Sequence, residues 1–155
     1  MIQMRFEGGK ELAAALGQLS DRVGKKVLKE ALETAAEPMR RAMEQKAPYE
    51  PGPPDIRANI VISNLPRVSG ESLGAHAAAV GVGPAKGFSY GHLQEFGTVH
   101  HAAQPFMRQS FDGTAQKVLD TLRQALWVEL AAKGVHAAAK TESGPIEGGP
   151  GGSTL

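Results

Sequence analysis

The sequence contains no cysteine, and this absence excludes disulfide bridges and thiolate metal sites. Aromatic residues are scarce, at 5% of the chain, so we expect a core built from Leu, Val, Ile, Met and Ala. A charge of one sign is missing as well, because 17 Lys and Arg stand against 16 Asp and Glu. This balance gives no electrostatic reason to expect binding to nucleic acid or to a membrane surface.

Long apolar runs are also absent. No stretch approaches the roughly 20 apolar residues that a membrane-spanning helix needs. The first residues, MIQMRFEGGKELAAAL, lack the apolar core of a signal peptide. We therefore expect a soluble protein of the cytoplasm, or of a structure assembled there. With 155 residues, the chain is long enough to bury a core and is expected to form one domain.

The beginning of the chain changes its hydrophobic period after a pair of glycines. Residues 2–7 alternate apolar and polar side chains, which is typical of a half-buried strand. After the glycines, apolar side chains recur every three or four residues at Leu12, Leu16 and Leu19, so a short helix is predicted here.

A longer amphipathic helix is predicted next. Ser20 or Asp21 can cap its N-terminus, and its apolar stripe ends near Lys46, just before a run of prolines. Pro38 falls inside the helix and lacks the N–H that would bond the carbonyl group of Thr34. We therefore expect a kink at this proline.

Two strands are predicted in the middle of the chain. The proline-rich stretch YEPGPPDI reads as an extended loop. IRANIVIS is rich in β-branched residues and predicts a strand, whereas LGAHAAAVGVG predicts a second strand less strongly because Ala and Gly disfavour strands. NLPRVSGES between them is expected to form a surface turn.

A second long helix is predicted near the C-terminus. Pro105 suits the first position of a helix, and Gly134 is a suitable stop. Gly113 is either a local cost inside this helix or a sign that it begins at Asp112. The side chains expected on the buried face are Phe106, Ser110, Val118, Leu119, Leu122, Leu126 and Leu130.

These elements predict an α+β fold. We expect a small antiparallel sheet packed against a long kinked N-terminal helix and a long C-terminal helix. The predicted domain covers residues 1–134. Residues 135–155 are rich in Gly, Pro and Ser and predict a C-terminal arm that becomes ordered on assembly, against a neighbouring subunit.

The charged side chains of the first long helix alternate in sign. Arg40, Arg41 and Lys46 are interspersed with Glu37 and Glu44. This pattern indicates a solvated helix face with pairs such as Glu37 to Arg41, and a dedicated DNA-binding helix would show less compensation.

Three of the five histidines lie close to an acid in the segment YGHLQEFGTVHHAAQPFMRQSFD, residues 90–112. A zinc-dependent hydrolase using His92, Glu95 and His100 is one interpretation. The spacing is unlike that of zinc-binding helices, which place two histidines four residues apart. His100 and His101 are adjacent, so in an extended segment their side chains point in opposite directions. The other interpretation is a connector that protrudes and meets a partner.

The frame around these histidines resembles a known family. The patterns Y-x-x-x-x-E-F-G-T and A-x-P-F-x-R are similar to the minor tail-component family of lambdoid long-tailed phages, also called neck, tail-completion or head–tail joining proteins. The resemblance extends over about residues 5–130. It includes the KAP that ends the first long helix, whereas DIRANI departs from the family's usual T-G-x-L-R-x-S-I. The motif residues are Tyr90, Glu95, Phe96, Gly97, Thr98, Ala103, Pro105, Phe106 and Arg108.

The resemblance implies a structural protein of the virion neck or tail, assembled in the host cytoplasm, with no enzymatic activity and no cofactor. It implies a homo-oligomeric, sixfold ring that joins the head connector or stopper protein to the tail tube protein. DNA would pass through this ring without sequence recognition, and no membrane would be involved. The motif residues would be framework or interface positions, with the histidines in a variable loop. A prophage-encoded binding module is the alternative.

Overall fold

The computed structural model of the chain describes residues 8–48, 55–68, 70–74 and 77–135. The fold is α+β, as the sequence predicts: two long helices and a small antiparallel sheet form its main part. In chain order the elements are α1 (Gly9–Gly17), α2 (Asp21–Lys46), the 3₁₀ helix η1 (Arg57–Asn59), β1 (Ile60–Leu65), β2 (Arg67–Val68), β3 (Glu71–Ser72), β4 (Ala79–Pro84), α3 (Tyr90–Phe96) and α4 (Phe106–Ala132).

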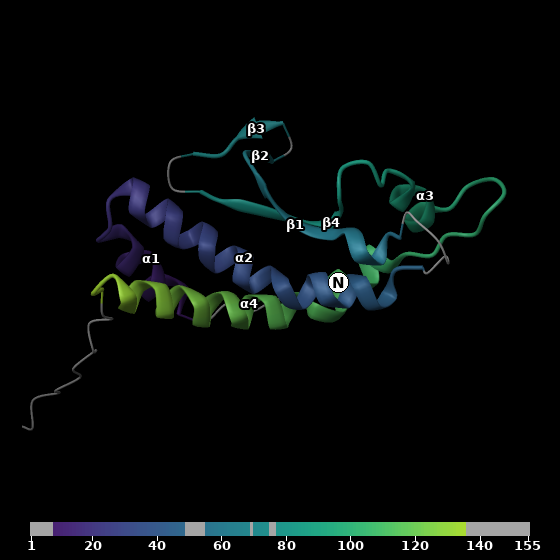
Figure 1. Ribbon diagram of the computed structural model, residues 1–155. Coiled ribbons are helices and arrows are strands. Elements are labelled where there is room, and N and C mark those ends of the chain that lie inside the picture. The colour runs from purple at the N-terminus through teal and green to yellow at the C-terminus, as the bar shows by residue number, and fades with distance from the viewer. Residues whose placement is uncertain (1–7, 49–54, 69, 75–76, 136–155) are drawn as a thin grey trace, which may run out of the picture.

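Helix α2 is the central element. Figure 1 shows α4 running antiparallel to α2 along one side, with β1 and β4 on the other side and α3 near the end of α2 where α4 begins. β1 pairs with β4 in antiparallel register, from Ile60 opposite Pro84 to Leu65 opposite Ala79. The long C-terminal helix therefore packs mainly on α2, and the sheet covers the opposite side of the same helix.

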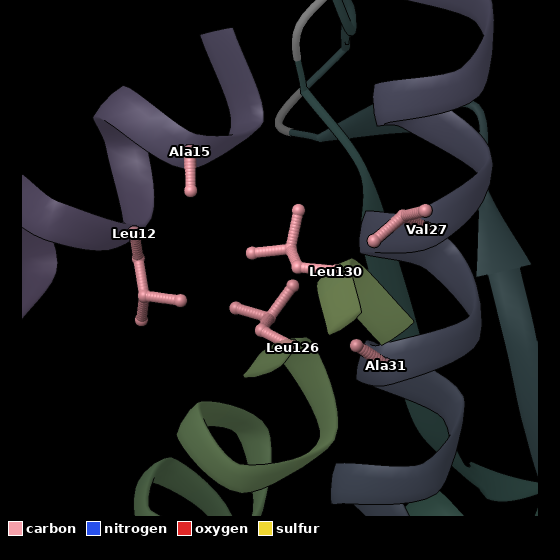
Figure 2. Close-up of a cluster of buried hydrophobic side chains, with 6 residues drawn as sticks. All are labelled: Leu12, Ala15, Val27, Ala31, Leu126 and Leu130. Atoms are coloured by element: carbon pink, nitrogen blue, oxygen red, sulfur yellow. The ribbon is translucent and has the colours of Figure 1, made fainter. Parts of the chain in front are cut away.

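The core consists of two apolar clusters at the two ends of α2. The first joins α1, the N-terminal half of α2 and the C-terminal half of α4 (Figure 2). Its buried members are Leu12, Ala15, Val27, Ala31, Leu126 and Leu130. The second joins the C-terminal end of α2 to the sheet and to the first turn of α4. Its buried members are Met43, Ala47, Ile56, Ile60 and Phe106.

Small side chains bring the two long helices together. Ala31, Ala35 and Ala36 of α2 are buried, and Ala115 of α4 is buried as well. Because alanine keeps the helix backbones close and has high helix propensity, these positions favour both the helices and their contact. The scarcity of aromatic residues is thus reflected in a core of small and aliphatic side chains.

The predictions for the first half of the chain are confirmed where the structure describes it. α1 and α2 begin and end close to the predicted positions, and Ser20 lies at the N-cap of α2 although its side chain makes no capping hydrogen bond. α2 continues through Pro38 to Lys46, and the kink remains a prediction. The predicted strand at residues 2–7 lies outside the described residues.

The predicted strand at IRANIVIS begins later than expected. Residues 57–59 form the 3₁₀ helix η1, and β1 starts only at Ile60. Asp55 causes the difference, because its carboxylate accepts the Arg57 N–H at 3.0 Å and its carbonyl accepts the Asn59 side-chain amide at 2.8 Å. Local side-chain bonds of this kind compete with strand formation.

The predicted turn and the second strand also need correction. NLPRVSGES contains a small ribbon in which β2 pairs with β3, Arg67 opposite Ser72. Gly70, with φ of +84°, lies at the tip of this ribbon. The second strand begins later than predicted, because β4 starts only at Ala79 within LGAHAAAVGVG and ends at Pro84, one residue beyond that stretch.

α4 runs without interruption from Phe106 to Ala132, so of the two interpretations of Gly113 the start at Asp112 is wrong. Gly113 is a helical residue, and Pro105 occupies the N-cap position rather than the first turn. Gly134 has φ of +74° and follows the helix, as a C-terminal stop does. No helix among the described residues is long and apolar enough to cross a bilayer. Of the predicted C-terminal arm, only Val135 lies within the described residues.

Candidate interaction site

Helix α3 is a single short helix fixed against the end of β4. Gly91 is buried there, and a Cβ atom at this position would lie 2.8 Å from Cγ of Pro84. Tyr90 is half-buried and packs near Phe88, with ring centroids 5.9 Å apart. A small residue and an aromatic side chain thus bring the start of α3 onto the second core cluster.

Glu95 connects α3 to α4. Its side chain is only 5% exposed, and its two carboxylate oxygens accept the backbone N–H groups of Met107 at 2.8 Å and of Arg108 at 3.0 Å. These amides belong to the first turn of α4 and have no partner within the helix. Pro105 at the N-cap has no side-chain acceptor, so Glu95 supplies the cap from ten residues earlier, and its negative charge meets the positive end of the helix dipole.

Gly97 ends α3 in a conformation that requires glycine. Its φ and ψ are +75° and 176°, a region that other residues hardly adopt. A Cβ atom here would lie 2.7 Å from the backbone N of Ala103 and 2.9 Å from the carbonyl oxygen of His101. The returning chain therefore passes directly over this glycine.

The loop after Gly97 is closed by its own hydrogen bonds. Thr98 and His101 exchange backbone bonds, with N–O distances of 2.8 and 3.3 Å. The Gln104 N–H donates to the carbonyl oxygen of Gln94 at 2.7 Å and ties the end of the loop back to α3. The sequence predicted a connector between two ordered pieces, and the connector is a compact turn bonded to both.

The nine motif residues fall into two groups. Buried or half-buried framework positions hold α3 and the start of α4 in place. They are Tyr90, Glu95, Gly97, Pro105 and Phe106. Phe106 is 2% exposed and lies in the second core cluster. The other motif residues are exposed at the surface. They are Phe96, Thr98, Ala103 and Arg108.

Helix α3 and the turn that follows it present a group of exposed apolar side chains. Leu93 is 55% exposed, Phe96 67% and Val99 97%. We call these three residues the apolar tip. Leu93 and Phe96 are three residues apart on α3 and therefore share a helix face. Because burying such side chains against a partner is favourable, the apolar tip is a candidate contact surface.

Leu93 and Val99 are not among the residues that the sequence motif predicted for the site. The signal that could have identified Leu93 is its i, i+3 spacing to Phe96 in a helix too short to bury both of its faces. Val99 gave no such signal, because a single valine in a short spacer is as compatible with burial as with exposure. Its position depends on the bonds that close the turn.

The histidines of the segment do not form a metal site with Glu95. His92, His100 and His101 are all exposed, whereas Glu95 is buried with both oxygens bonded to the α4 backbone. Within the described ranges, no three His, Cys, Asp or Glu side chains are grouped as metal ligands. Glu95 therefore has a structural role as the cap of α4 and is not available as the carboxylate ligand that the zinc-hydrolase interpretation requires.

The charged face of α2 carries an ion-pair network. Glu37 accepts two bonds from the Arg40 guanidinium, at 2.6 and 2.8 Å, and one from Arg41 at 3.1 Å. Arg40 also pairs with Glu44. The bonds from Arg40, with a smaller contribution from Arg41, lower the pKa of Glu37 from 4.5 to about 2, and those from Glu37 raise the pKa of Arg40. The predicted i, i+4 pair of Glu37 and Arg41 is thus confirmed.

A comparison with protein families decides the assignment. The model of the family described as "Bacteriophage HK97-gp10, putative tail-component" matches residues 10–97, more than half of the chain. The chain belongs to the HK97 gp10-like family of phage tail components. No curated protein and no solved structure matches it. In this gp10-like chain the family match includes α1, α2, the sheet and α3, and it ends at Gly97, the residue that terminates α3.

The boundary of the match divides the motif. Tyr90, Glu95, Phe96 and Gly97 lie inside the matched region of the gp10-like chain, and the A-x-P-F-x-R pattern lies beyond it. The two parts are nevertheless one structural unit, because Glu95 from the matched part caps the helix that begins in the other part. The resemblance seen in the sequence is therefore correct at the level of the family.

Proposed function

We infer that this gp10-like protein is a virion structural protein that forms a homo-oligomeric ring at the head–tail junction of a tailed phage. In this role it joins the head connector or stopper protein to the tail tube protein, as a neck, tail-completion or terminator component. The observation that carries the proposal is membership of the tail-component family over residues 10–97. The family implies a non-enzymatic role, with no cofactor.

The apolar tip supports a function in assembly. Its side chains are exposed on α3 and on the turn that follows it, and this unit is held in place by the Glu95 cap and by the packing around Gly97. A surface that is rigid before binding loses little conformational entropy when it meets a partner. We assign the apolar tip to the contact with the neighbouring copy in the ring.

A sixfold ring is compatible with a single tip on each subunit. Rings close through heterologous contacts, in which one surface of a subunit meets a different surface of the next. The formal net charge of +1 also fits a channel through which DNA passes without sequence recognition, because it provides no strong overall attraction to phosphate. The parts of the proposal therefore fit one another physically.

The decisive experiment deletes the gene from the parent phage or prophage, induces lysis and images the lysate. We expect filled heads separate from tails, or tails of uncontrolled length, and we expect normal virions when the gene is supplied in trans. Normal virions in normal number without the gene would overturn the junction role. In that case a prophage-encoded binding module would be the better assignment.

A further inference from the structure

A groove lies on the sheet side of α2, at the opposite end of the helix from its C-terminal core cluster. It has a volume of about 330 Å³. Its apolar lining comes from the end of β1 and the residues around β3 and β4: Leu65, Pro66, Leu73, Ala78 and Ala79. Lys25 and Lys29 of α2 form its basic rim. An occupant that suits this groove combines an apolar side chain with negative charge.

The basic rim belongs to a cationic stripe on the first turns of α2. Arg22, Lys25, Lys26 and Lys29 are all exposed, with no acid between them in the sequence. Cations near a helix N-terminus oppose the helix dipole and cost stability. Lys25 donates to the carbonyl oxygen of Gly74 at 3.4 Å, but neither Lys25 nor Lys29 has a carboxylate partner in the part of the chain that the structure describes. The stripe is therefore better explained by an anionic occupant than by the stability of α2.

The C-terminal arm has the matching chemistry. From residue 141 onward it contains two acids, Glu142 and Glu147, and no Lys or Arg, and Ile146 lies between these acids. The N-terminal residues 1–7 contain one Arg and one Glu and offer no such excess of negative charge. Charge complementarity thus favours the arm over the other end of the chain.

The arm also starts close to the groove. Val135 packs against the first core cluster, which includes Val27 of α2, and its N–H bonds the Leu130 carbonyl at 3.0 Å. Lys25 and Lys29 are each two residues from Val27 and so lie on the opposite face of the same helical turns. A helix is about 10–12 Å wide, whereas the eleven residues from Val135 to Ile146 can span roughly 35–40 Å.

We propose that residues 142–147 of the arm dock in this groove of their own chain, with Ile146 on the apolar lining and the two glutamates at Lys25 and Lys29. The short path from Val135 makes the chain's own groove a nearer site than the neighbouring subunit that the composition suggested. This docking would occur in the isolated chain and does not depend on the proposed role at the head–tail junction.

The absence of cysteine permits a direct test by disulfide formation in the full chain. The test pair is Leu65→Cys with Ile146→Cys. The control pair is Val128→Cys with Ile146→Cys, because Val128 is 67% exposed on α4 and nearer to the arm along the chain. Under mild oxidation we expect the test pair to cross-link at least about tenfold faster than the control, as a monomer. Ala78→Cys replaces Leu65→Cys if that variant fails to fold.

Four results would overturn the proposal. Equal rates for the two pairs would mean that the arm has no preference for the groove. A cross-linked dimer as the main product would assign the groove to the arm of a second copy. We expect Lys25→Glu with Lys29→Glu to slow cross-linking of the test pair at least threefold. An unchanged cross-linking rate would show that the lysines make no contact with the glutamates of the arm. The test pair could also cross-link only at the background rate while the protein retains duplex DNA. If the two lysine substitutions abolish this retention, the lysines bind phosphate instead of the arm.

Discussion

At the residue scale, the central observation is that Glu95 caps helix α4 by accepting hydrogen bonds from backbone N–H groups of its first turn. A glutamate near three histidines resembles a ligand in the sequence, where only spacing is visible. In the fold its two oxygens bond the N–H groups of Met107 and Arg108, and the histidines remain exposed. The sequence could not predict this role, because a cap supplied from ten residues upstream depends on the path of the intervening turn.

Removing the capping charge should destabilise the protein. We expect Glu95→Gln to lower the free energy of unfolding by about 1–2 kcal/mol, because an amide offers one acceptor where the carboxylate offers two and has no charge for the helix dipole. Denaturant unfolding measures the change. The control Glu71→Gln, at an exposed position of β3, should stay within about 0.5 kcal/mol of the wild type. Equal stabilities of the two variants would show that the cap is dispensable.

A substitution at Gly97 measures how closely the returning chain packs on this residue. We expect Gly97→Ala to cost about 3 kcal/mol or more, because the backbone conformation suits only glycine and the new Cβ would lie 2.7 Å from a backbone nitrogen. Gly134→Ala is the matched control, since it has a similar positive φ of +74° but open space around it, and should cost about 1–2 kcal/mol. Thermal or urea unfolding of both variants measures what the Gly97 backbone conformation and the close contact together cost beyond a positive φ in open space. Identical losses would mean that the chain moves away from Gly97 easily.

At the element scale, the sequence predicted the long helices better than the strands. α2 and α4 extend over many turns, so their apolar periodicity and their proline and glycine boundaries are strong local signals. The β2–β3 ribbon and η1 escaped prediction because each has only two or three residues per element and depends on local bonds such as those of Asp55. The apolar stripe of α4 was also predicted only in part, since buried Ala115 was absent from it.

The anchoring of α4 at its first turn depends on Phe106. We expect Phe106→Ala to lower the free energy of unfolding by about 3–5 kcal/mol, because the ring is 2% exposed in the second core cluster. Phe111→Ala on the same helix is the control: this ring is partly exposed and its loss should cost about 1 kcal/mol. The two values come from denaturant unfolding under one condition. A change of only a few tenths for Phe106→Ala would contradict its place in the core.

The ion pairs of α2 predict a pH-dependent contribution. The pKa of Glu37 is about 2 in the folded chain, below the ordinary 4.5, because Arg40 and Arg41 stabilise the carboxylate. The contribution is therefore present above pH 4.5 and is lost as the pH falls to about 2. The pair is partly exposed, so we expect Glu37→Gln to cost less than about 1 kcal/mol at pH 7. The stability difference between wild type and variant, measured from pH 7 to 2, should shrink towards acid; a constant difference would contradict the linkage.

At the scale of the whole molecule, α2 organises both the core and the surfaces. One side of the helix holds α4 through alanines and leucines, and the other side holds the sheet. The apolar tip lies on α3 and the turn that follows it, whereas the groove with its basic rim lies beside the first turns of α2. Because the two surfaces are separate, the proposed docking of the arm in the groove would leave the apolar tip accessible for another contact.

The apolar tip supplies the test of assembly at this scale. We expect Phe96→Asp to leave the subunit folded but to reduce the yield of joined virions at least about tenfold in complementation of the deleted gene, because a charge cannot be buried in an apolar contact without a partner. Val128→Asp is the matched control: its side chain is also 67% exposed but lies on α4, and this variant should complement normally. Unfolding curves check that both variants fold. Full complementation by Phe96→Asp would exclude the tip as the contact between copies, while equal failure of both variants would point to a general intolerance of surface charge.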